Sequence, residues 1–112
     1  MWEIKETSPN SELRHGHVAT VVTGGTPVPT PLSPVSHTFV RGILIRAPGA
    51  GDPVPNVDTV CIGRKNVTPN SDAGTGGMPL PPGASIELPV EDPADVYVVS
   101  LSAGQDVAWM GV

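Results

Sequence analysis

The apolar residues of this chain fall into short runs that are separated by proline and glycine. The clearest run covers residues 84–90, where apolar and other residues alternate one by one in the order Ala84, Ser85, Ile86, Glu87, Leu88, Pro89 and Val90. Alternation with a period of two is typical of a strand with one buried face. Proline lacks a backbone donor and glycine tolerates the positive φ of tight turns, so the segments between the runs favour turns over helices.

Five further runs predict strands, at residues 13–23, 37–47, 57–64, 95–101 and 105–112. In the second of these, Ile43, Leu44 and Ile45 are consecutive, which predicts burial on both faces of a strand in the middle of the domain.

Residues 26–36 carry four prolines at near-alternate positions. Such a stretch runs extended as a connector or lies at a sheet edge, and it is not a central strand. A proline-rich recognition motif is the alternative interpretation.

Six strands joined by turns predict an all-β fold, namely a small antiparallel β-sandwich or barrel with about six to eight strands and Pro/Gly-rich loops. A parallel sheet would require crossover helices, and no segment has the length for one. The 112 residues correspond to one domain. We therefore assign residues 1–12 to an extended N-terminal arm and residues 13–112 to a single β-sandwich domain.

The composition leaves the predicted fold unchanged, but it argues against two classes of partner, nucleic acids and membranes. The 13 glycines and 14 prolines approach a disorder-like level, yet 38% of the residues are hydrophobic and cluster in strand-sized runs, which favours an ordered domain. A net charge of −5 with six scattered Lys and Arg residues argues against nucleic-acid binding. No run has the length of a membrane span and no signal peptide is visible, so we expect no membrane partner.

The N-terminal arm carries the predicted partner-binding residues. Trp2 and Ile4 lie on the same side of an extended segment because they are two residues apart. Trp2 either fills the core of its own domain or anchors the arm on a partner. Large exposed aromatic residues favour interfaces, so Trp2 and Ile4 are predicted to bind a partner.

Three histidines suggest a metal site. His15 and His17 project from the same strand face, a spacing that can ligate zinc or copper, and His37 joins them only if its strand lies alongside. The alternative is that strand histidines are surface or core residues. A closed site requires four ligands with supporting groups, and no such set is visible, so we predict no metal and no cofactor.

The remaining candidates for chemistry favour structural roles. The acidic residues Glu87, Glu91, Asp92 and Asp95 could bind calcium, but two prolines interrupt them and a solvated turn is favoured. Cys61 is the single cysteine, so it forms no internal disulfide, and it is predicted to be a small buried thiol. No serine lies on an identifiable nucleophile turn, so we predict no catalytic residue and no enzymatic activity.

The order of the motifs resembles that of small virion proteins of tailed bacteriophages. The matching pieces are RGILIRAP at 41–48, a strand ending in glycine at 60–63, a Val-Thr turn at 67–68, a glycine-rich PLPPG segment at 76–83, an apolar strand at 86–90 and VYVVS at 96–100. The resemblance covers roughly three quarters of the chain. Its motifs mark strands and turns, and they transfer no catalytic or ligand residue.

Proteins of this kind are small β domains of phage heads or tails, including head decoration proteins. The resemblance therefore implies a non-enzymatic capsid decoration or cement protein that bridges neighbouring subunits on the outer capsid surface of the virion, after assembly in the host cytoplasm. The expected partners are the major capsid protein or another virion protein, and copies of the same chain, with a trimer as a plausible oligomer. The alternatives are a ligand- or carbohydrate-binding β-sandwich and a tail or connector component of the same virion.

Overall fold

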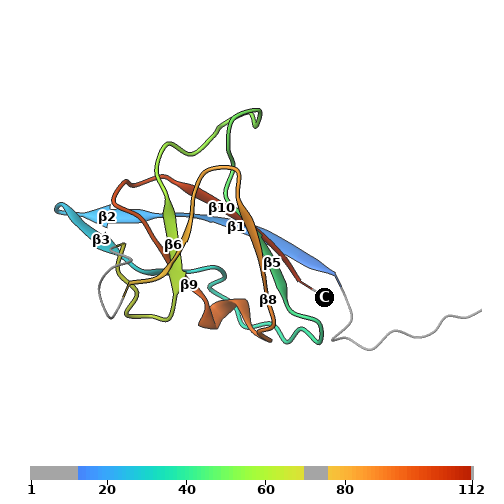
Figure 1. Ribbon diagram of the computed structural model, residues 1–112. Coiled ribbons are helices and arrows are strands. Elements are labelled where there is room, and N and C mark those ends of the chain that lie inside the picture. The colour runs from blue at the N-terminus through green and yellow to red at the C-terminus, as the bar shows by residue number, and fades with distance from the viewer. Residues whose placement is uncertain (1–12, 70–75, 112) are drawn as a thin grey trace, which may run out of the picture.

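The computed structural model describes residues 13–69 and 76–111. Two four-stranded sheets face each other (Figure 1). Sheet 1 has the order β1 (Arg14–Ala19), β10 (Asp106–Gly111), β5 (Ile43–Arg46) and β8 (Ser85–Leu88). Sheet 2 has the order β4 (Thr30–Pro31), β9 (Tyr97–Val99), β6 (Val60–Gly63) and β7 (Met78–Leu80). A hairpin of β2 (Val21–Thr23) and β3 (Thr26–Val28) projects at the left of Figure 1.

The predicted all-β antiparallel fold is confirmed. Every ladder between these strands is antiparallel. The described residues contain ten strands, more than the six to eight expected. The segments expected to be loops contribute the short strands β3, β4 and β7, and the strand predicted at residues 13–23 is divided into β1 and β2. The only helical element among them is the 3₁₀ turn η2 (Pro93–Asp95). In this part of the chain no helix is long and apolar enough to cross a membrane.

The core lies between the two sheets and takes side chains from both. Sheet 1 contributes Ile43, Ile45, Val107 and Trp109, and sheet 2 contributes Val60, Ile62, Leu80 and Val98. The indole Nε1–H of Trp109 donates a hydrogen bond of 3.0 Å to the carbonyl oxygen of Leu32, so its one polar group is satisfied in the core. Phe39 and Val96 also lie in this core, and Ile86 and Leu88 pack against it while half-buried.

The strand predicted at residues 13–23 is interrupted at Thr20. β1 pairs with β10 up to Ala19, and β2 then pairs with β3. Thr20 is buried, and its hydroxyl donates to the carbonyl of Ser102 and accepts from the backbone N–H of Gln105. These bonds hold the chain at the point where it leaves one sheet for the hairpin.

The strand predicted at residues 37–47 is shorter, and its predicted burial on both faces is wrong. Regular pairing begins only at Ile43, after Gly42, which has φ +112° and whose added Cβ would lie 2.4 Å from the carbonyl oxygen of Leu88. Leu44 is 42% exposed, because nothing described covers the outer side of sheet 1. Consecutive burial occurs instead in β6, at Val60, Cys61 and Ile62.

The proline-rich stretch behaves as predicted for an edge. β3 lies in the two-stranded hairpin, and β4 is the edge strand of sheet 2, where Pro31 pairs with Tyr97. Proline is tolerated there because the strand has no partner on its other side.

Candidate functional site

No segment within residues 13–69 and 76–111 covers the outer face of sheet 1, and its side chains at Leu44 and Met110 are exposed; we call it the open face. Met110 of β10 and Leu44 of β5 are cross-strand partners at its centre. They are 46% and 42% exposed. In the same row β1 contributes His15 and β8 contributes Glu87. The row beside it consists of His17, Ala108, Arg46 and Ser85. The open face thus has an apolar centre and a polar, charged border.

A shallow hollow of about 400 Å³ lies at one end of the open face. It is lined by Arg41, Leu44, Glu87, Pro89 and Met110, together with neighbouring backbone. Its lining therefore combines apolar side chains with one cation and one carboxylate. A surface of this kind suits a protein partner, because interfaces combine an apolar centre with a polar rim.

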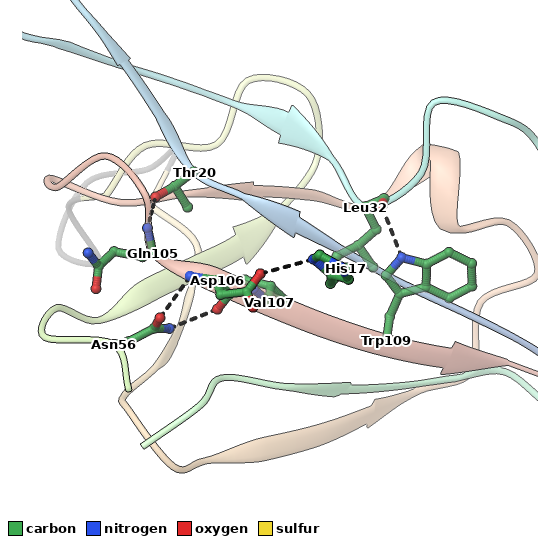
Figure 2. Close-up of polar contacts among 8 residues, drawn as sticks. All are labelled: His17, Thr20, Leu32, Asn56, Gln105, Asp106, Val107 and Trp109. Carbon is green, nitrogen blue, oxygen red and sulfur yellow. Dashed lines mark hydrogen bonds and ion pairs between the residues drawn. The ribbon is translucent and has the colours of Figure 1, made fainter. Parts of the chain in front are cut away.

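A polar cluster fixes the other end of β10 (Figure 2). The side-chain amide of Asn56 donates to the carbonyl of Asp106 at 2.8 Å, and its Oδ1 accepts from the backbone N–H of Asp106 at 2.7 Å. Asn56 thereby pairs with β10 as another strand would. The Asp106 carboxylate faces the ring of exposed His17, with 3.4 Å between Oδ1 and Nδ1. This pair stands at the border of the open face.

Gln105 joins the same cluster to the loop before β6. Its Oε1 accepts hydrogen bonds from the backbone N–H groups of Val57 and Asp58, at 2.8 and 3.0 Å. Its own backbone N–H donates to the Thr20 hydroxyl, as Figure 2 shows. Buried polar groups are stable only when they are bonded in this way, so we interpret the cluster as structural support for β10 and not as a reactive site.

The outer face of sheet 2 differs from the open face because the chain folds back over it; we call it the covered face. Val67 is buried there against Cys61 and Val99, and half-buried Tyr97 packs against this group. Gly63 and Gly77 make room for Val67, whose Cγ2 would lie 2.8 and 2.5 Å from a Cβ added at these positions. Cys61 is a buried thiol, as predicted, and burial raises its pKa above the ordinary value.

The predicted partner-binding residues Trp2 and Ile4 lie outside the described residues, as does the N-terminal arm of residues 1–12. They remain predictions.

The histidines do not come together as a metal site in the described part of the chain. His15 and His17 are exposed on the open face, whereas His37 stacks on Phe39 with 5.8 Å between ring centroids. His15 and His37 border one further hollow beside Trp109. No group of three or more His, Cys, Asp or Glu residues that could hold a metal ion occurs among residues 13–69 and 76–111.

The acidic residues at 87–95 do not form such a group either. Glu87 lies on the open face, whereas Asp92 caps η2, accepting from the N–H groups of Ala94 and His37 at 2.9 and 3.2 Å. Burial disfavours the charged form of Asp92, but these hydrogen bonds outweigh it and lower its pKa below 3.8. The expected turn is therefore an ordered cap.

Two of the three described aromatic residues of the Phe, Tyr and Trp type are buried. Trp109 is 6% exposed and Phe39 is 2% exposed. Two glycines leave the space that these rings fill. A Cβ added to Gly16 would lie 2.9 Å from the Trp109 side chain, and one added to Gly111 would lie 2.3 Å from the Phe39 side chain. Neither ring is available to stack on a sugar, and only Tyr97 keeps a partly exposed ring.

The sequence reasoning missed Leu44 and Met110 as surface residues. A signal was present, because Leu44 shares its strand parity with Arg46, and Met110 shares its parity with Asp106. Parity with a charged residue places an apolar side chain on the polar side of a strand.

No family model, no curated protein and no solved structure matches this chain.

Proposed function

We propose that this chain is a non-enzymatic structural protein of a tailed-bacteriophage virion, which attaches to the outer capsid surface and bridges neighbouring subunits of the shell. The observation that carries the proposal is the open face of sheet 1. Leu44 and Met110 adjoin each other across two strands, within a border that includes His17, Arg46 and Glu87. Single exposed apolar residues are ordinary, but contiguous ones with a polar border are typical of contact surfaces.

The resemblance to phage virion proteins supports the choice of partner. The motif RGILIRAP at 41–48 contains β5, one of the two strands that supply the centre of the open face. The proposed partner is the major capsid protein or another virion protein. Several copies, for example three around a local threefold position, would each bind the shell through the open face. The interface area buried in this way would stabilise the contacts between neighbouring subunits.

Binding to capsid shells that lack the protein tests this function. Purified protein is added to such shells, and bound protein is measured by co-sedimentation together with the temperature at which the shells break. We expect stoichiometric binding and a higher breaking temperature. If the protein does not bind and the shells survive heat equally well with and without it, the proposed function is wrong.

Charge substitution on the open face locates the contact. Leu44→Glu and Met110→Glu each place a carboxylate at the apolar centre, and we expect binding to shells to weaken by tenfold or more, about 1.4 kcal/mol or above. Leu101→Glu is the matched control, because Leu101 is 70% exposed and lies outside the strands of the open face. Equal loss in all three variants would contradict the assignment of the open face.

The arm is proposed as a second anchor through Trp2 and Ile4. Trp2→Ala should weaken binding to shells and leave the melting temperature of the isolated protein nearly unchanged. A large decrease in that temperature would instead place Trp2 in the core of its own domain.

A further inference from the structure

Another hollow lies on the outer side of sheet 2, and none of its lining residues belongs to the open face. It is lined by Arg64, Lys65 and Asn66, by Asp95 and by Tyr97. The first three follow β6 directly, Asp95 ends η2, and Tyr97 begins β9. The pairing of Gly63 with Tyr97 brings these segments together. The hollow therefore collects two cations, an amide, a carboxylate and an aromatic residue from two segments that are distant in the sequence.

Tyr97 is held in position by the covered face. It packs against the group of Cys61, Val67 and Val99, remains half-buried, and is one of the residues that line the hollow. The turn after β6 is also fixed, because the Val67 N–H donates to the carbonyl of Arg64 at 2.9 Å. The ring and the turn thus present their groups from supported backbone, which lowers the entropy lost when a ligand binds.

The two cations of the hollow are not neutralised by other described residues. Arg64 and Lys65 are exposed and form no ion pair with Asp95 or with any other residue of the described segments. Arg46 differs, since its guanidinium binds the Asp52 carboxylate through two hydrogen bonds of 3.2 and 3.0 Å. Arg64 and Lys65 are the only adjacent pair of Lys and Arg residues in this chain, whose net charge is −5. They can pair with an anion that approaches from outside.

This combination of groups selects one class of ligand. An aromatic ring stacks on the apolar face of a sugar ring, and the amide of Asn66 and the carboxylate of Asp95 can bond to hydroxyl groups. A guanidinium and an ammonium group suit a carboxylate on the same sugar. Nucleic acid would require a longer basic track than two residues.

We propose that the hollow formed by Arg64, Lys65, Asn66, Asp95 and Tyr97 binds an acidic saccharide, that is, a sugar ring that carries a carboxylate. The site is independent of the proposed attachment to a shell, because it lies on the opposite outer face. A saccharide of this class could be a free sugar acid or a unit of a surface polysaccharide.

NMR titration of ¹⁵N-labelled protein tests the site with defined probes. The probes are trigalacturonate, 3′-sialyllactose and monomeric galacturonate, with methyl-esterified trigalacturonate, lactose and inorganic phosphate as controls. We expect at least one carboxylated probe to bind with a Kd of about 1 mM or tighter and to shift the amides of residues 64–66 and 95–97. Binding of the monomer as tight as that of the trimer would indicate a free sugar acid, and tighter binding of the trimer would indicate a polysaccharide.

Substitutions separate the charge from the ring. Arg64→Gln and Lys65→Gln should each weaken binding by about tenfold, whereas Arg41→Gln, which removes one charge beside the open face, should not change it. Tyr97→Phe should retain binding, and Tyr97→Leu should weaken it by about tenfold with the fold intact in the NMR spectrum.

Three results would overturn the proposal. They are the absence of binding by every carboxylated probe up to about 10 mM, equally tight binding of phosphate or of the esterified trimer, and binding that Tyr97→Leu leaves unchanged. Failure here would leave the shell-binding result untouched, since that assay reads out the other face.

Discussion

The two outer faces of this sandwich differ in whether another described segment of the chain covers them. On sheet 2, the turn after β6 folds back so that Val67 covers Cys61 and Val99. On sheet 1, Leu44 and Met110 have no described segment above them. Both faces present apolar side chains from antiparallel strands, so the strands themselves do not explain the difference. The difference lies in whether a neighbouring loop ends in an apolar residue that can reach the face, and it makes one face part of the core and the other available for contact.

The largest expected difference between the faces is in thiol reactivity. Native Cys61 should react with a soluble maleimide about 10³-fold more slowly than the thiol of Leu44→Cys in a Cys61→Ala background, because Cys61 requires a local opening that costs about 4 kcal/mol. Labelling rates measured by mass spectrometry give the ratio. The rate for Cys61 should also keep rising at pH values where the rate for the exposed thiol has levelled off, since burial raises the pKa of the native Cys61 thiol.

The urea-unfolded protein is the control for this comparison, and in it both thiols should react at the same rate. Rapid labelling of native Cys61 would mean that Val67 does not close the covered face in solution.

Truncation of the cover should be the next largest effect. Val67→Ala removes a buried side chain from the covered face, and we expect it to lower the free energy of unfolding by about 1.5–3 kcal/mol. Urea unfolding measures the change, and an unaltered dependence on urea concentration shows that the unfolded state is the same. A loss below about 0.5 kcal/mol would place Val67 among ordinary surface residues.

A smaller effect is expected at Asp92, which belongs to neither face and joins η2 to the segment before β5. Its pKa is lowered in the folded protein, so its carboxylate stabilises the fold above the unfolded pKa, and this contribution is lost as the pH falls through the folded value. Asp92→Asn should therefore cost about 1 kcal/mol at pH 7 and progressively less below about pH 4. Urea unfolding at several pH values measures this, and a cost that does not depend on pH would contradict it.

The smallest effect is expected on the open face. Leu44→Ala should change the free energy of unfolding by less than about 0.5 kcal/mol, because Leu44 is already 42% exposed and gains little from folding. The adjacent core substitution Ile45→Ala is its control, with an expected cost of about 2–5 kcal/mol. A loss of similar size at both positions would indicate that another segment or another copy covers the open face in solution.

The fold class could be predicted because its signals are local. Alternation at residues 84–90 marks a half-buried strand, and β8 has alternating burial. Prolines at 26–36 exclude a central strand, and β4 lies at an edge. Each of these inferences depends only on how neighbouring residues constrain the backbone.

The assignment of faces could not be predicted, because it depends on contacts between distant segments. Ile43, Leu44 and Ile45 are as apolar as Val60, Cys61 and Ile62, yet only the second run is buried throughout. Val67 stands in a polar stretch that has the pattern of an ordinary loop. Val67 covers this face because the chain folds back over Gly63 and Gly77. The pattern of apolar and polar residues does not predict where such a loop packs.

The hollow beside Tyr97 could not be predicted from the sequence, because it also depends on contacts between distant segments. In the sequence, Arg64 and Lys65 are the one pair of adjacent Lys and Arg residues, and Asp95 lies about thirty residues further on among other acidic residues. Their meeting with an aromatic ring depends on the register between β6 and β9, in which Gly63 is opposite Tyr97. Register between strands that are more than thirty residues apart is decided by the whole sheet.

The strand order of sheet 1 has a consequence for biosynthesis. β10 lies between β1 and β5, although it leaves the ribosome after both of them. β1 therefore remains without its strand partner in sheet 1 until β10 has been translated. A nascent chain halted before residue 106 would lack β10, so β1 would stay separated from β5 and β8, and chaperones and proteases of the cell would encounter an incomplete sheet.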